Sequence, residues 1–106
     1  METRTISRKD VDYFTNLLTE AGVSVAAVIG SSPQAEAAIL AASKCCDAVI
    51  PLPTDITLHA AKRKLILYHC DCILYDSLYG ELPYRVENDG VTFVEHFICL
   101  DSDETN

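Results

Sequence analysis

The stretch that decides the fold is residues 53–80, PTDITLHAAKRKLILYHCDCILYDSLYG. Apolar residues recur there at alternating steps of three and four, at Leu58, Ala61, Leu65, Tyr68, Cys72, Tyr75 and Tyr79. At ~100° per residue these positions share one stripe, which predicts a single amphipathic helix over 54–79, capped by Thr54 or Asp55. A strand over residues 65–72 is the alternative, because β-branched and aromatic side chains are frequent there.

A second apolar line runs along the same predicted helix, about half a turn away from the first. The helices upstream can cover the first stripe, but the second line has no obvious partner within the chain. A helix that is apolar on two faces suits a subunit packed between like neighbours. We therefore expect a homo-oligomer whose subunit interface contains Ala60, Leu67, Leu74, Leu78, Val91 and Phe93.

Two shorter helices are predicted upstream. The first follows a capping box at residues 7–10 and stops at Gly22. The second starts with Ser32 as cap and Pro33 as first residue, and it either continues to Val49 or stops near Cys46. If residues 23–29 and 47–50 are strands, the centre is a βαβ unit and the protein is α/β. If both are helical or irregular, the protein is a bundle, which we favour because the apolar stripe of residues 35–49 is unbroken.

Downstream of Gly80 the period changes. Two β-rich runs within residues 83–100 flank Asn88, Asp89 and Gly90, which predicts a β-hairpin with Gly90 at positive φ. Pro51-Leu52-Pro53, directly before the long predicted helix, is typical of a stiff, extended link. The predicted fold is therefore mainly α, a small bundle of about three helices with a C-terminal hairpin. It forms a single domain over 1–106, with loose ends at 1–6 and 101–106.

Charge and cysteine content limit the classes of function that this chain can have. The 16 acidic against 8 basic residues give a net charge of −8, which argues against a domain that grips nucleic acid. Solubility, imitation of nucleic acid, or a surface that nucleic acid slides past would each use such a charge. The five cysteines are odd in number and follow no secretory signal, so we expect reduced thiols. The absence of a signal peptide and of a long apolar run predicts a soluble cytoplasmic protein without a membrane role.

No motif predicts catalysis or a cofactor. His69, Cys70, Asp71 and Cys72 lack the C-x-x-C spacing of a zinc site, and on a helix residues 70 and 72 diverge by about 200°. The four glycines form no phosphate cradle, and no nucleophile elbow accompanies any Cys–His pair. The residues after a turn-like segment at 18–29 include no Arg or Lys to read DNA. We therefore predict no catalytic, cofactor-binding or metal-binding residue, no specific nucleic-acid binding and no small-molecule substrate.

The order of these features resembles a known family. A capped helix beginning at Thr5, an Ala-rich helix at residues 35–42, a proline link at 50–53, a helix at 55–79 and then a glycine turn before a β segment look like the small head–tail connector (adaptor) proteins of tailed bacteriophages. This resemblance implies a non-enzymatic structural protein of the virion neck. It also implies a ring between portal and tail-side proteins, through which DNA passes.

Two other functions remain open from the residues. One is a small acidic inhibitor that imitates nucleic acid and blocks a host nuclease or DNA-binding protein. The other is a small α/β enzyme or ligand-binding domain, which requires strands at 23–29 and 47–50 together with a pocket of convergent polar groups.

Overall fold

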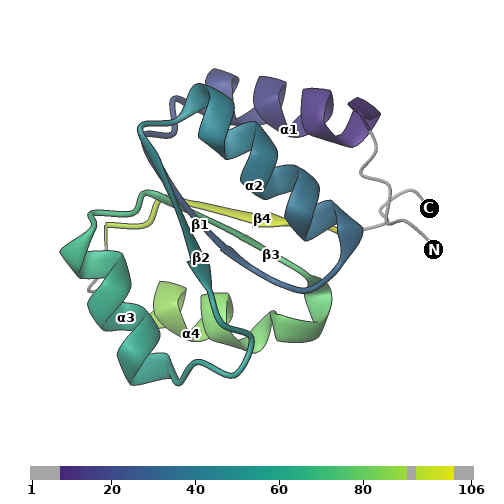
Figure 1. Ribbon diagram of the computed structural model, residues 1–106. Helices are drawn as coiled ribbons and strands as arrows, with labels where there is room; N and C mark the ends of the chain where they lie inside the picture. The colour runs from purple at the N-terminus through teal and green to yellow at the C-terminus, as the bar shows by residue number, and fades with distance from the viewer. Residues whose placement is uncertain (1–7, 91–92, 102–106) are drawn as a thin grey trace.

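The protein is a three-layer α/β unit. The computed structural model describes residues 8–90 and 93–101, and in these a parallel sheet lies between two pairs of helices (Figure 1). The elements follow in the order α1 (Arg8–Ala21), β1 (Val25–Ile29), α2 (Pro33–Cys45), β2 (Ala48–Leu52), α3 (Leu58–Leu67), β3 (Cys72–Tyr75), the 3₁₀ helix η1 (Ser77–Tyr79), α4 (Glu81–Asp89) and β4 (His96–Cys99).

The four strands lie in the order β2-β1-β3-β4, and all three pairings are parallel. The register places Ala27 of β1 opposite Ile50 of β2 on one side and Ile73 of β3 on the other. The crossover helices α2, α3 and α4 supply the return connections that parallel strands need. Helices therefore cover both faces of the sheet, as expected for strands that are apolar on both sides.

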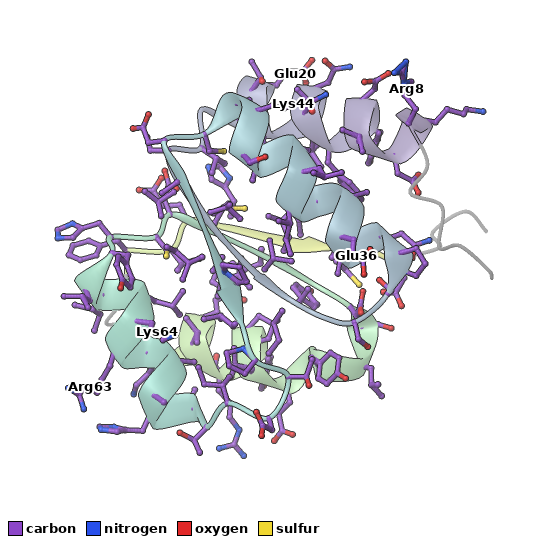
Figure 2. The ribbon with its side chains drawn as sticks, in the orientation of Figure 1. Arg8, Glu20, Glu36, Lys44, Arg63 and Lys64 are labelled. Carbon is purple, nitrogen blue, oxygen red and sulfur yellow. The ribbon has the colours of Figure 1, made fainter. Side chains whose placement is uncertain are left out.

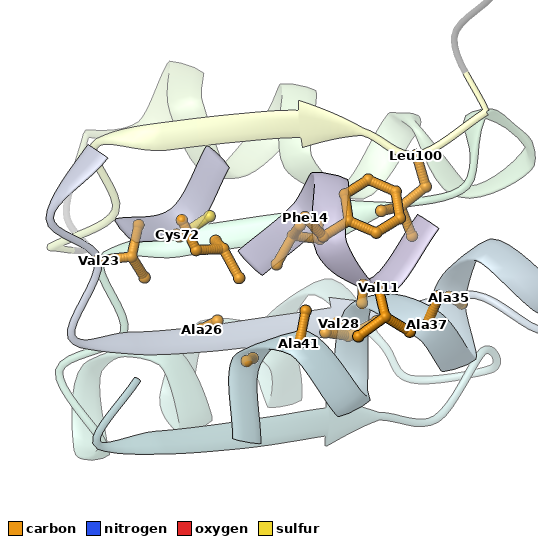
Figure 3. Packing of buried hydrophobic residues seen from close by; sticks show 14 residues of the cluster. Val11, Phe14, Val23, Ala26, Val28, Ala35, Ala37, Ala41, Cys72 and Leu100 are labelled. Atoms are coloured by element: carbon orange, nitrogen blue, oxygen red, sulfur yellow. The ribbon is translucent and has the colours of Figure 1, made fainter. Parts of the chain in front are cut away.

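The alternation of side chains along β1 divides the core in two. Ala26 and Val28 belong to the cluster under α1 and α2, whereas Ala27 and Ile29 belong to the cluster under α3 and α4. Figure 3 shows the first cluster, where Phe14 of α1 and the alanines of α2 lie over β1 and β3.

The α/β alternative is the one that the structure supports, and the favoured helical bundle is wrong. Residues 25–29 and 48–52 are strands, and α2 between them ends at Cys45, close to the earlier of its two predicted stops. Cys46 adopts an extended conformation, which breaks the helix although the apolar pattern continues. Apolar residues in a buried parallel strand leave no period of their own, so the stripe of residues 35–49 merged a helix with a strand.

The predicted caps of the first two helices are confirmed in part. α1 ends before Gly22, which has φ of 71° as a left-handed stop requires. Ser32 caps α2, and its hydroxyl accepts a hydrogen bond from the Ala35 N–H at 3.1 Å. The predicted cap of α1 at Ser7 lies outside the described residues.

The single helix over 54–79 is wrong. α3 is capped by Thr57 and ends after ten residues, and the chain then forms β3 and η1. His69 stops the helix in the left-handed conformation, with φ of 55°. The N–H of His69 donates to the Ile66 carbonyl and that of Cys70 to the Leu65 carbonyl, the hydrogen-bond pattern of a Schellman cap.

The hairpin over 83–100 is wrong as well. Residues 81–89 form α4, and Gly90 caps its end with φ of 65°. The positive φ predicted for Gly90 is thus confirmed, but it ends a helix instead of turning a hairpin. β4 pairs with β3 in parallel and does not pair with residues 83–87.

Two aspartates bracket β3 and hold it against β1. Asp71, just before β3, accepts hydrogen bonds from the N–H groups of Ser24 and Val25 at 3.0–3.2 Å. Asp76, just after β3, does the same for the residues that follow β1. Both ends of the central strand pair are therefore fixed by carboxylates. No helix within the described residues is long and apolar enough to cross a membrane.

Candidate functional site at the carboxyl edge of the sheet

The site lies where the chain changes direction across the sheet. From β1 the chain passes through α2 on one face to β2, and from β3 it passes through α4 on the other face to β4. The neighbouring strands β1 and β3 thus send their connections to opposite faces (Figure 1). In open parallel sheets, ligands bind outside the carboxyl ends of strands at such a switch point.

A buried carboxylate occupies the start of α2 at this point. Asp76, which is 5% exposed, accepts hydrogen bonds from the N–H groups of Ser31 at 3.0 Å and Ser32 at 3.2 Å, and from the Ser32 hydroxyl at 2.6 Å. Gly30 permits this approach, because a Cβ at residue 30 would lie 2.5 Å from the Asp76 Oδ2. A helix N-terminus is usually available to an anionic ligand. Here the chain supplies its own anion, so a phosphate cannot bind without displacing Asp76.

A second carboxylate fixes the ends of β3 and β4. Asp101 accepts hydrogen bonds from the Ser77 N–H at 2.8 Å and from the Ser77 hydroxyl at 2.9 Å. The Ser77 N–H holds the pKa of Asp101 below its ordinary value of 3.8. Asp101 belongs to the segment predicted as a loose end, but in the structure it anchors the start of η1.

Beside these anchors is a hollow of about 320 Å³. Its walls come from four parts of the chain: the end of β1, the loop between β2 and α3 with the first residue of α3, η1, and the outer side of α4. The lining residues are Ile29, Thr54, Ile56, Leu58, Leu78, Tyr79, Glu81, Leu82 and Arg85. Five of these nine side chains are aliphatic and the other four carry polar groups, so the hollow can contact both a hydrocarbon part and a polar part of a ligand.

The cation at the hollow is Arg85, and it is only weakly engaged. Arg85 donates to the Glu81 carboxylate through Nε and Nη2, both at 3.1 Å, one helical turn apart on α4. The side chains are 57% and 76% exposed, and a pair of this kind contributes ~0.3–0.5 kcal/mol. A ligand carboxylate can therefore replace Glu81 at little cost.

Nothing at this edge resembles a nucleophilic or metal centre. Among the described residues, no group of three or more His, Cys, Asp or Glu side chains is placed to hold a metal ion. The structure contains no disulfide within its described part, and all five cysteines are free. The cysteine at this edge is Cys99, whose thiol donates to the Asp101 carboxylate at 3.4 Å. Burial, followed by this hydrogen bond, raises the pKa of Cys99, so the thiol is a poor nucleophile at neutral pH. Cys70 and Cys72 lie at the opposite, amino end of β3, where burial raises their pKa to about 11 and about 12.

The six residues predicted as a subunit interface do not form one surface. Ala60 and Leu67 lie together on the outer side of α3, and Leu67 is 69% exposed. Leu78 is exposed at the hollow, on the opposite edge. Leu74 is fully buried in β3, because it belongs to a strand and not to the helix assumed for it, so its assignment to an interface is wrong. Phe93 stacks on His69, with ring centroids 4.4 Å apart, and Val91 lies outside the described residues.

The sequence identified Ser32 only as a helix cap, and Gly30, Asp76 and Ser77 were missed. Gly30 and Asp76 each follow a short apolar run directly, and Ser32 and Ser77 follow within the next two residues. Polar residues at the ends of neighbouring buried strands are the signal that would have located the edge. That signal depends on assigning residues 72–75 to a strand.

Comparisons with known proteins show what this fold is similar to. No protein-family model matches the chain, and no curated protein matches its sequence. Among solved structures, the N-terminal domain of FACL13 from Mycobacterium tuberculosis superposes with a TM-score of 0.76 at 16% identity, over 88% of this chain and 25% of that one. IdnL7 gives a TM-score of 0.74 at 23% identity, over 88% and 18%. The long-chain-fatty-acid-CoA ligase FadD1 from Archaeoglobus fulgidus gives 0.75 at 16% identity, over 92% and 20%.

These neighbours overturn the resemblance to phage head–tail connector proteins. The matching structures include a fatty acyl-CoA synthetase and a long-chain-fatty-acid-CoA ligase, and none of those reported above is a virion component. The predictions of a ring-forming connector, of a nucleic-acid-like inhibitor and of a non-enzymatic protein are wrong on the same ground, and the virion location has no support. At these identities the likeness is one of fold, and the chain spans a quarter or less of the structures that it matches. This chain therefore has the fold of an α/β unit that acyl-CoA ligase structures contain.

Proposed function

We propose that this chain binds a fatty acid in the hollow at the carboxyl edge of the sheet, as the α/β unit of an acyl-CoA ligase-like enzyme. The observation that carries the proposal is the hollow itself, which combines aliphatic side chains with the cation Arg85. The matching structures support the ligand class, because they include a fatty acyl-CoA synthetase and a long-chain-fatty-acid-CoA ligase. The chain spans a quarter or less of those proteins, so the ligand-binding step is assigned to it and the ligation is not.

The energetics favour an amphiphile over a polar ligand. Each methylene that leaves water contributes ~0.8 kcal/mol, and Ile56, Leu58 and Leu78 supply the exposed apolar surface. The ligand carboxylate pairs with Arg85 in place of Glu81. A phosphate is disfavoured, because Asp76 already fills the N-terminus of α2.

Calorimetric titration with laurate tests the proposal. Acetate serves as the head group without the chain, and dodecylamine as the same chain with the opposite charge. We expect saturable binding of laurate with a Kd below ~1 mM and much weaker binding of both controls. The absence of saturable laurate binding, or equal binding of dodecylamine, would refute the proposal.

Two variants locate the site. Leu78→Glu places a charge at the hollow on a residue that is 80% exposed, so the fold is retained while laurate binding weakens at least ~10-fold. Leu40→Glu makes the same change on α2, across the sheet, and should leave laurate binding within ~2-fold of wild type. Equal losses in the two variants would place the ligand elsewhere.

A further inference from the structure

A second hollow lies on the outer side of α3, away from the carboxyl-edge site. It measures about 530 Å³, and all its lining residues come from this helix: Ala60, Arg63, Lys64, Ile66 and Leu67. Only Ala61 and Leu65 of α3 are fully buried against the sheet. Ile66 and Leu67 line this hollow and are exposed, by 39% and 69%, and no described part of the chain covers them.

The spacing on this surface is that of a helix-packing stripe. Ala60, Lys64 and Leu67 are separated by four and three residues, so they lie above one another along α3. The small side chain of Ala60 allows another helix to approach closely, and Leu67 provides a projecting side chain for its grooves. Phe93, stacked on His69, extends the apolar surface beyond the end of α3.

The charge on this surface is opposite to that of the rest of the molecule. Lys62, Arg63 and Lys64 are three of the eight basic residues in a chain of net charge −8. Lys62 forms an ion pair with Asp89 of α4, but within the described residues neither Arg63 nor Lys64 has an acidic partner. Both come from α3, across the sheet from Arg8 and Lys44 (Figure 2).

The geometry points to α3 as a docking surface for an acidic amphipathic helix of a partner polypeptide. Apolar side chains of that helix fill the hollow around Ala60 and Leu67, and its carboxylates pair with Arg63 and Lys64. A narrow helix contacts only this cationic strip, because charges more than ~8 Å away are screened at physiological salt. An anionic membrane or a nucleic acid presents a broad negative surface that the remaining acidic residues repel.

A second copy of this chain fits the surface less well. Symmetric pairing of two α3 surfaces would place Arg63 and Lys64 of one copy opposite the same residues of the other. Like charges across an interface oppose association. The partner is therefore a different segment.

Amide NMR shifts of the ¹⁵N-labelled chain test this docking surface. The probe is a synthetic helical peptide with Leu at i, i+3, i+4 and i+7 and Glu on both flanks, and its control carries Lys in place of every Glu. We expect the Glu peptide to shift the amides of α3 saturably, with a Kd on the order of 100 μM, and the Lys peptide to leave them unchanged. Added salt should weaken the binding of the Glu peptide, because it screens the charge pairs.

Variants and competing ligands complete the test. Leu67→Glu and Arg63→Glu alter exposed side chains, so the fold is kept. Each substitution should raise the Kd of the Glu peptide at least ~10-fold. Leu40→Glu, on α2, should leave that affinity within ~2-fold of wild type. The proposal is overturned if neither peptide shifts α3 or if both do. It is equally overturned if phosphatidylglycerol vesicles, or higher concentrations of the chain alone, shift these amides while the Glu peptide does not.

Discussion

The two faces of the sheet are closed to different degrees. On one face, α1 packs directly against α2. The buried residues of α2 on this face are five alanines, Ala35, Ala37, Ala38, Ala41 and Ala42. On the other face, α3 and α4 each bury two residues and leave large apolar side chains exposed. Both hollows discussed above border this second face. The chain thus packs α1 and α2 tightly against each other on one face and packs α3 and α4 more loosely on the other. A hollow beside Val11, Leu40 and Lys44 also borders the first face.

Small side chains explain the closed face. Alanines on α2 let α1 and the sheet approach the helix closely, so the packing is dense and has little freedom to adjust. The open face is built from larger residues on two helices that contact each other little. The open face can therefore relax more easily around a truncated side chain.

The largest expected effect compares matched truncations on the two faces. Leu18 of α1 and Leu65 of α3 are both fully buried. We expect Leu18→Ala to lower the free energy of unfolding by ~4 kcal/mol and Leu65→Ala by ~2–3 kcal/mol, because the cavity on the open face collapses more completely. Urea unfolding followed by circular dichroism measures both. A larger loss for Leu65→Ala would break the contrast between the faces.

A smaller effect comes from enlarging an alanine on each face. Ala38 is fully buried, whereas Ala60 lines the outer hollow of α3. Ala38→Leu should lower the free energy of unfolding by ~1–3 kcal/mol through overpacking. Ala60→Leu should change it by less than ~0.5 kcal/mol. If both substitutions are equally tolerated in urea unfolding, the closed face is not as tightly packed as the structure indicates.

The same contrast explains what could be predicted from the sequence. The first two helices follow from caps and glycine signals that act within a few residues, such as Ser32 with Pro33 and Gly22. The part of the chain that forms the open face (α3, β3 and α4, the open half) could not be predicted in this way. Its stop signal is His69 in a conformation that usually requires glycine, and Gly90 serves equally well for a hairpin turn or a helix cap.

β3 was hidden for a different reason. Residues 72–75 are apolar on both faces of the sheet, so they continue a helical stripe as readily as they form a buried strand. The candidate site was missed for the same reason, because Asp76 and Ser77 mark an edge of the sheet only once β3 is known to end at Tyr75. Long-range pairing of β3 with β1 decides the matter, and it leaves no local trace in the sequence.

The smallest expected effect concerns the anchor of the open half, Asp101, which holds Ser77 at the start of η1. Its pKa is below the ordinary 3.8 in the folded protein. The stabilisation is therefore fully present above the unfolded pKa and is lost as the pH falls through the lower, folded value. Asp101→Asn should unfold at slightly lower urea than wild type at pH 6, and this difference should shrink towards pH 3. Asp101 is largely exposed, so we expect a modest shift of the midpoint. A difference that stays constant from pH 6 to pH 3 would mean that the Asp101 charge does not hold η1, and that the open half is anchored by packing alone.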